Sequence, residues 1–165
     1  MTPARHGSTV IELPNDHDVL ITRDFEAPIA LVFDALTKPE HMTKWLFERE
    51  LKECSVDLCV GGNYHFVFVT DEGADMSFSG TYLEVEPPTR TVATWLVEGR
   101  PEGLPDAHAI ETCDLHETDG VTRMTVKLAF SDRAVRPTRF DGMQDSYERL
   151  DDLLRSLQRP AAAAE

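Results

Sequence analysis

The longest hydrophobic pattern in the chain lies near its C-terminal end, between Phe140 and Gln158. Apolar residues recur there mostly at intervals of three or four, as on one face of an α-helix, and polar residues fill the other positions. Asp141 is expected to cap the start of this helix, answered by Gln144 three residues later, and Pro160 to end it. The apolar stripe consists of Phe140, Met143, Tyr147, Leu150, Leu153, Leu154 and Leu157.

Most of the chain before this helix alternates between apolar and polar residues, which is typical of β-strands. Short turn sequences such as Asp71-Glu72-Gly73 and Asp119-Gly120 separate several of the alternating stretches, and links of hairpin length imply an antiparallel sheet. A short extended piece is expected at 10–13. Strands are expected at 19–25, 51–58, 64–69, 76–82, 91–97, 109–116 and 121–130.

Two short helices are predicted after the strand at 19–25. Pro28 suits the first position of one helix, and Pro39 starts a shorter one that carries Met42 and Trp45. The order of elements predicts an α+β protein in which the last helix covers one face of an antiparallel sheet. We expect one domain over residues 1–165, with a core of about 19–158 and flexible ends at 1–9 and 160–165.

Composition narrows the classes of function. The 165 residues include 30 acidic and 16 basic ones, for a formal charge of −14. Such a surface repels phosphate groups, so binding to nucleic acids or to anionic membranes is not expected. No apolar run approaches membrane-spanning length, so membrane insertion is not expected either. The N-terminus lacks an apolar signal core, and the three cysteines are expected to be reduced thiols of a cytoplasmic protein. The six histidines and three cysteines show no metal-ligand spacing, and no phosphate loop or nucleophile elbow occurs, so no metal or cofactor is expected.

An ordered set of short motifs connects the chain to a known family. Together these motifs resemble the activator-of-Hsp90-ATPase-homologue branch of the START-like superfamily, over roughly 19–157. That superfamily also contains the Bet v 1 allergens, lipid-transfer START domains and polyketide cyclases. The motifs are Phe25-Glu26-Ala27-Pro28, Val32-Phe33 with Trp45, Gly61-Gly62-x-Tyr64-x-Phe66, Gly80-Thr81-Tyr82-x-Glu84-Val85-x-Pro87-Pro88-x-Arg90, Thr94-Trp95, Asp119-Gly120-x-Thr122 and Gly142-Met143.

The resemblance implies a helix-grip fold, in which a curved antiparallel sheet wraps around the C-terminal helix, usually with an apolar cavity between them. It does not imply one function, because members of the superfamily differ widely in activity. The chain departs from its relatives at Ser146-Tyr147, where a glycine-tryptophan pair often follows the Gly-Met motif. Tyr147 keeps an aromatic ring at this position and adds a hydroxyl group.

Large aromatic and methionine side chains form the first candidate site. The alternation within each strand predicts that they face the helix, where they either line a ligand cavity or simply fill the core. The residues predicted to line such a cavity are Tyr64, Phe66, Phe68, Met76, Phe78, Trp95, Met143 and Tyr147.

Glu111 is the single most distinctive residue of the pattern. It alternates in phase with Ala109, Cys113 and Leu115, so a carboxylate is predicted beside the cavity if this set faces inward. A buried carboxyl group has a raised pKa and can orient a ligand hydroxyl or transfer a proton. The alternative is that Glu111 is solvated after a slip of register, or is paired with another residue. The candidate partners are Arg90, Arg123 and Tyr147.

Three functional hypotheses follow from the residues and the resemblance. The first is a non-enzymatic binding protein for a hydrophobic or aromatic small molecule, with Glu111 as the polar anchor. The second is an enzyme of the polyketide cyclase or dehydratase kind that uses Glu111 and Tyr147 as acid and base. The third is a chaperone-associated interaction module, which needs an exposed apolar patch. The sequence leaves the formation of a homodimer open.

Overall fold

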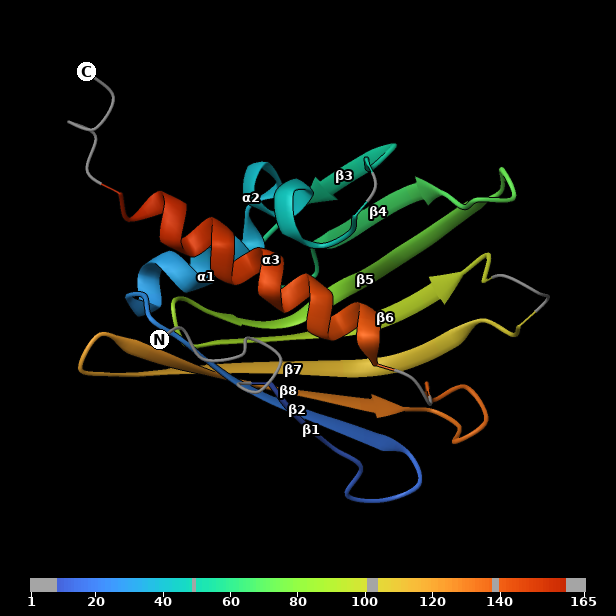
Figure 1. Cartoon of the computed structure of the whole chain (residues 1–165). Helices are drawn as coiled ribbons and strands as arrows, with labels where there is room; N and C mark the ends of the chain where they lie inside the picture. The colour runs from blue at the N-terminus through green and yellow to red at the C-terminus, as the bar shows by residue number, and fades with distance from the viewer. Residues whose placement is uncertain (1–8, 49, 101–103, 138–139, 160–165) are drawn as a thin grey trace.

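The structure is a computed structural model that describes residues 9–48, 50–100, 104–137 and 140–159. Eight strands form one curved antiparallel sheet in the order β1-β2-β8-β7-β6-β5-β4-β3 (Figure 1). The predicted sequence of a strand, two short helices, six strands and a long helix is confirmed, as is the helix-grip fold. The strands are β1 (Val10–Glu12), β2 (Asp18–Phe25), β3 (Glu53–Val56), β4 (Asn63–Val69), β5 (Asp75–Glu86), β6 (Arg90–Glu98), β7 (Ala107–Thr118) and β8 (Val121–Phe130).

The strand boundaries differ from the predicted ones where the alternation is irregular. β3 is confined to Glu53–Val56, which is shorter than the predicted stretch 51–58. β5 continues past Tyr82 to Glu86, because the register shifts between Tyr82 and Glu84 and pairing with β6 then resumes. Such a bulge changes which side chains face inward, so alternation alone could not follow the strand across it.

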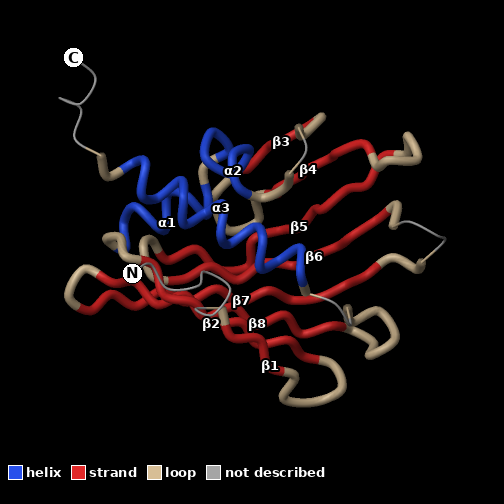
Figure 2. The backbone as a smooth tube through the Cα atoms, in the orientation of Figure 1, coloured by secondary structure: helices blue, strands red, loops and turns tan. Residues whose placement is uncertain are grey.

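The three helices lie on the same face of the sheet (Figure 2). They are α1 (Ile29–Thr37), α2 (Pro39–Trp45) and α3 (Asp141–Leu157). Two predicted helix starts need correction, because Pro28 and Phe140 occupy the positions just before α1 and α3. Asp141 is therefore the first residue of α3 rather than its cap, and the predicted capping arrangement with Gln144 is wrong.

The start of α1 is held by the sheet instead of by its own cap residue. The Pro28 side chain offers no hydrogen-bond acceptor, and the backbone N–H of Ile29 donates to Glu117 Oε1 from β7 at 2.8 Å. A carboxylate at this point also interacts favourably with the helix dipole. Thr122 Oγ1 on β8 donates to the Ala27 carbonyl at 2.7 Å, so both long central strands fix the segment that leads into α1.

The core lies between the sheet and the helices, and the predicted faces account for it. On β8 the inward side chains Met124 and Leu128 are almost fully buried, as are Leu150 and Leu154 on α3. Full burial of one such side chain contributes about 1.5–3 kcal/mol of transfer free energy before conformational entropy is counted. The apolar stripe of α3 is therefore the face that joins this helix to the sheet.

One ion pair is buried within this interface. Arg23 on β2 and Asp151 on α3 are 2% and 7% exposed, and the Arg23 Nη2 and Asp151 Oδ2 atoms are 4.0 Å apart. Arg23 Nη1 also donates to Thr9 Oγ1 at 2.5 Å, which ties Thr9 to the sheet. Thr9 is the one residue of the predicted flexible segment 1–9 that the structure describes, while 1–8 and 160–165 lie outside the described residues.

Two further findings concern membrane-spanning helices and the state of the cysteines. Among the residues that the structure describes, no helix is long and apolar enough to cross a membrane. Cys54, Cys59 and Cys113 all carry free thiols.

Candidate functional site

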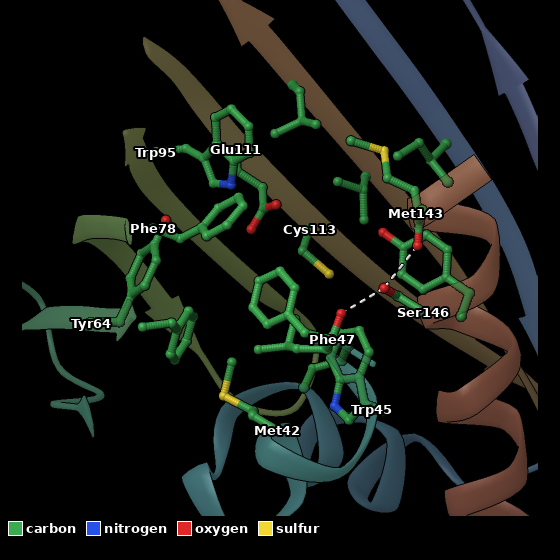
Figure 3. Close-up of a pocket in the computed structure, with 18 of the residues that line it drawn as sticks. Met42, Trp45, Phe47, Tyr64, Phe78, Trp95, Glu111, Cys113, Met143 and Ser146 are labelled. Carbon is green, nitrogen blue, oxygen red and sulfur yellow. Dashed lines mark hydrogen bonds between the residues drawn. The ribbon is translucent and has the colours of Figure 1, made fainter. Parts of the chain in front are cut away.

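A pocket of about 610 Å³ lies between the inner face of the sheet, α2 with the segment that follows it, and α3. Figure 3 shows side chains from all three of these regions directed toward a shared space. The pocket is bounded by strands that carry aromatic side chains and by Met42, Trp45 and Phe47 on the opposite side. Its walls are mainly apolar, as in most small-molecule sites.

The structure brings together all but one of the predicted site residues. Phe68 is the exception: it does not line the pocket, because the ring of Phe47 lies against it with ring centroids 4.8 Å apart. Phe47 also packs against Phe78 at 5.0 Å, so Phe68 forms part of the wall's support rather than its surface. The predicted residues that do line the pocket are Tyr64, Phe66, Met76, Phe78, Trp95, Glu111, Met143 and Tyr147.

The main contribution that sequence reasoning missed comes from α2 and the residues after it. Met42, Trp45, Leu46 and Phe47 all line the pocket. The predicted short helix identified Met42 and Trp45 as apolar, but its periodicity could not show which distant element they would face. Phe47 lies beyond the end of α2, where no repeating pattern exists to place its side chain.

Trp45 and α3 hold this side of the pocket in place. The Trp45 Nε1–H donates to the Ala35 carbonyl at 2.8 Å, and its ring stacks on Tyr147 with centroids 6.2 Å apart. From α3, Arg149 Nε donates to the Trp45 carbonyl at 3.0 Å and Ser146 Oγ to the Leu46 carbonyl at 2.7 Å. Figure 3 shows the Ser146 hydrogen bonds as dashed lines. Ser146 and Tyr147, which differ from the residues often found in the family, therefore both hold α2 and the segment after it against α3.

Tyr64 is fixed on the opposite wall by a close approach of two strands. Its hydroxyl donates to the Thr94 carbonyl at 2.9 Å. Its ring packs over Gly80, where an added Cβ would lie 2.5 Å from the ring and 1.9 Å from the Thr94 carbonyl oxygen. Gly80 is thus required by the space that the Tyr64 ring occupies, and the hydroxyl is committed to the sheet.

Glu111 lies on the inner face of β7, as the alternation predicted. Its cross-strand neighbours are Ala93 on β6 and Leu128 on β8, so no polar side chain stands directly beside it. Two of the predicted partners are wrong: Arg90 binds Asp114, and Arg123 binds Asp24, with both pairs on the outer side of the sheet. No residue in the described part of the chain donates a hydrogen bond to the Glu111 carboxylate.

Burial controls the ionisation of the groups in the pocket. Loss of solvation raises the pKa of Glu111 from an ordinary value of 4.5 to about 7. Loss of solvation, together with the Glu111 charge, also raises the pKa of Tyr64, Tyr82 and Tyr147 well above the usual value for tyrosine. Burial likewise raises the pKa of the Cys113 thiol above its usual range. At neutral pH, Glu111 is therefore the group among these whose charge changes.

The buried carboxyl group should make the stability of the protein depend on pH. Because the Glu111 pKa is higher in the folded than in the unfolded state, the folded state binds more protons between pH 4.5 and about 7. The contribution of Glu111 to the free energy of unfolding is most favourable below pH 4.5 and declines as pH rises to about 7. If no solvent reached Glu111, the free energy of unfolding would fall by roughly 3 kcal/mol over this pH range. We expect a fall of about 2 kcal/mol, because the pocket admits solvent.

Glu111→Gln should remove this decline and leave a variant more stable than the parent above pH 7. Urea unfolding of both proteins from pH 5 to 8 measures the difference. The exposed Glu86→Gln change on β5 serves as a control for the loss of one carboxylate. Parallel pH profiles for the parent and Glu111→Gln would contradict the assignment of a buried carboxyl group.

The described residues contain no group of three or more histidine, cysteine, aspartate or glutamate side chains arranged to hold a metal ion. The polar side chains that line the pocket include Glu111, Cys113 and the three tyrosines Tyr64, Tyr82 and Tyr147.

The sequence and the fold of this chain were compared with those of known proteins. The family model described as activator of Hsp90 ATPase homolog 1-like protein matches residues 26–155. Among curated proteins, no relative of this chain is found.

Three similar crystal structures cover nearly the whole chain. A Rhodobacter sphaeroides protein is 25% identical with a TM-score of 0.79, over 91% of this chain and 99% of its own. A Nitrosomonas europaea protein is 26% identical with a TM-score of 0.72, over 88% of this chain and 99% of its own. A Chromobacterium violaceum protein is 27% identical with a TM-score of 0.71, over 85% of this chain and 98% of its own.

Proposed function

Since the chain belongs to the activator of Hsp90 ATPase homolog 1-like family, and its fold leaves a pocket beneath the last helix, we propose that it binds a small apolar or aromatic molecule there. The observation that carries the proposal is the lining of the pocket. Rings and methionines from four strands and three helices surround about 610 Å³, which is within the size range of drug-sized ligand sites. In this proposal the protein holds its ligand without transforming it.

Two properties of this lining favour the binding of an apolar ligand. Aromatic side chains such as Phe78 and Trp95 are held by other rings, with their centroids 5.9 Å apart, so little ordering is needed when a ligand enters. Apolar surface removed from water contributes about 25 cal/mol per Å². The unpaired Glu111 carboxylate then favours ligands that bring a hydrogen-bond donor to one end.

A second candidate, an enzyme of the cyclase or dehydratase kind, is favoured by one specific observation. Glu111 and Tyr147 line the same pocket, and the Glu111 charge is close enough to raise the Tyr147 pKa. A carboxyl group with a pKa near 7 can donate or accept a proton at neutral pH. Turnover of a bound ligand, lost in both Glu111→Gln and Tyr147→Phe, would select this candidate over simple binding.

The chaperone-associated hypothesis has less support from the described surface. It needs an exposed apolar patch, and no single helix or strand among the described residues contributes more than one large exposed apolar side chain. These side chains are Val10, Leu13, Val60, Val69, Leu83, Leu104, Ile110 and Leu157.

Ligand-induced thermal shift tests the proposal. A panel of flavonoids, fatty acids, sterols and aromatic polyketides should contain molecules that raise the melting temperature. A ligand at a hundred times its dissociation constant adds about 2.7 kcal/mol of stability, or roughly 5–10 °C for a chain of this size.

A pair of variants on β7 separates pocket binding from surface binding. Cys113 lines the pocket, and its neighbour Thr112 faces the outer side of the sheet. Cys113→Phe should place a ring inside the pocket and reduce or abolish the shift, while Thr112→Phe adds the same ring outside and should preserve it. Each shift is measured from the variant's own melting temperature. Equal shifts in both variants would place the ligand elsewhere and contradict the proposal.

A further inference from the structure

The charges around Glu111 indicate the chemical class of the ligand that the pocket would bind. This inference rests on the proposed function. Glu111 is a carboxyl group on the wall of the pocket that becomes anionic as pH rises through about 7, and no cationic side chain of the described residues pairs with it. The shift in its pKa has burial as its cause, with no contribution from a neighbouring positive charge. A carboxylate in such a place is stabilised most by a cation that arrives with the ligand.

The positive groups of this region are already engaged with other residues. Arg149 lines the pocket, but its guanidinium donates to the Trp45 and Leu46 carbonyls and lies 3.9 Å from Glu48. Arg100 also lines the pocket, and its guanidinium donates to the Pro105 carbonyl at 2.9 Å.

Arg23 approaches from β2, where it pairs with Asp151 and donates to Thr9. Its charge acts on Tyr147, whose pKa it lowers slightly against the stronger raising effects. It has no resolved effect on Glu111.

The aromatic rings near Glu111 suit a positive charge. Trp95 lies two residues from Ala93, the cross-strand neighbour of Glu111, and thus on the same inward face of β6. Figure 3 shows the Glu111 carboxylate directed into the pocket on the side where Trp95, Phe78 and Tyr64 are drawn. The faces of aromatic rings attract ammonium groups, most strongly where water is excluded. The acidic chain, with its formal charge of −14, also favours the approach of cations over anions.

We propose that the pocket selects an aromatic or aliphatic molecule that carries a protonated amine, with the ammonium group bound between the Glu111 carboxylate and the rings of Trp95 and Phe78. The apolar remainder of the ligand lies against the methionine and aromatic walls toward α2 and α3. A neutral alcohol of the same shape offers Glu111 one hydrogen bond but no charge, so it should bind less tightly than the amine.

The proposal makes binding depend on pH in a defined direction. The groups whose pKa the Glu111 charge raises are Tyr64, Tyr82, Cys113 and Tyr147, so none of them ionises near neutral pH. Affinity for an amine should therefore rise with pH up to about 7, by as much as about tenfold per pH unit, and level off above it.

Three probes of one shape test the proposal: naphthylethylamine, naphthylethanol and propylnaphthalene, measured by calorimetry or fluorescence at pH 8. We expect the amine to bind about 10–100-fold more tightly than the hydrocarbon, with the alcohol between them. Glu111→Gln should weaken the amine at least about tenfold and leave the hydrocarbon within about twofold. Glu86→Gln, which removes an exposed carboxylate of β5, should change neither.

The outcomes separate the inference from the function on which it rests. If the hydrocarbon binds as tightly as the amine, or if Glu111→Gln leaves amine affinity and its pH dependence unchanged, the cationic ligand is excluded while apolar binding stands. If the alcohol matches the amine, Glu111 acts as an acceptor for neutral hydroxyl groups and the inference is overturned. If none of the three binds, the proposed function fails with it.

Discussion

Replacing Trp45 with alanine is expected to lower the free energy of unfolding by about 3–5 kcal/mol and to abolish ligand binding. Trp45 is 5% exposed, stacks on Tyr147, and donates to the Ala35 carbonyl. Alanine at this position removes the ring, leaves a void beside α3, and deprives the Ala35 carbonyl of its donor. The segment after α2, which carries Phe47, loses its ring contact with α3 and keeps the hydrogen bonds that Ser146 and Arg149 donate to backbone carbonyls.

A graded series of variants tests this explanation by urea unfolding and thermal shift. Trp45→Phe retains a ring against Tyr147 but loses the N–H, so it should cost about 1–3 kcal/mol. Phe47→Ala keeps the Trp45 anchor and should impair ligand binding more than stability. A Trp45→Ala protein that unfolds like the parent would show that the α2 segment is held without Trp45.

Replacing Asp151 with alanine is expected to cost about 3 kcal/mol, since it removes the carboxylate that lies 4.0 Å from the buried Arg23 guanidinium and 3.3 Å from Arg155. We choose the lower end of the range for broken buried pairs because Arg23 keeps its hydrogen bond to Thr9 and its position 5.3 Å from the centroid of the Phe25 ring. Chemical denaturation at neutral pH gives the difference directly.

Two controls distinguish the loss of the ion pair from other effects. Glu72→Ala removes an exposed carboxylate from the turn between β4 and β5 and should change stability by less than about 0.5 kcal/mol. The double change Arg23→Met with Asp151→Leu removes both charges and should recover most of the stability, because well-packed apolar residues often replace a buried pair without loss. A double variant as unstable as Asp151→Ala would show that the cost arises from packing rather than charge.

Much of the fold could be predicted from the sequence because each inward face repeats with a regular period. The stripe of α3 and the alternation in β4, β7 and β8 are local properties, and a buried face imposes them along the whole element. Glu111 was placed correctly for the same reason, since Ala109, Cys113 and Leu115 fix the phase of its strand. The match over residues 26–155 agrees with the order of motifs seen in the sequence.

The remaining features depend on contacts between distant segments. The partners suggested for Glu111 were wrong because Arg90 and Arg123 find carboxylates on the outer face of neighbouring strands. Phe68 has the inward phase but is covered by Phe47, a residue from a segment without periodicity. No local pattern encodes which non-repeating residue will lie over a given strand.

The pairing of β2 with β8 has a consequence for the way the protein is made. Register partners such as Ile21 and Val126 are about a hundred residues apart, so the two strands emerge from the ribosome at different times. At roughly 5–20 residues per second, β2 waits several seconds for β8, and until then it has only the short strand β1 beside it. Nascent chains that end before β8 should therefore need chaperones most. In a chain stalled on the ribosome before Val121 is made, β2 should be accessible to proteases.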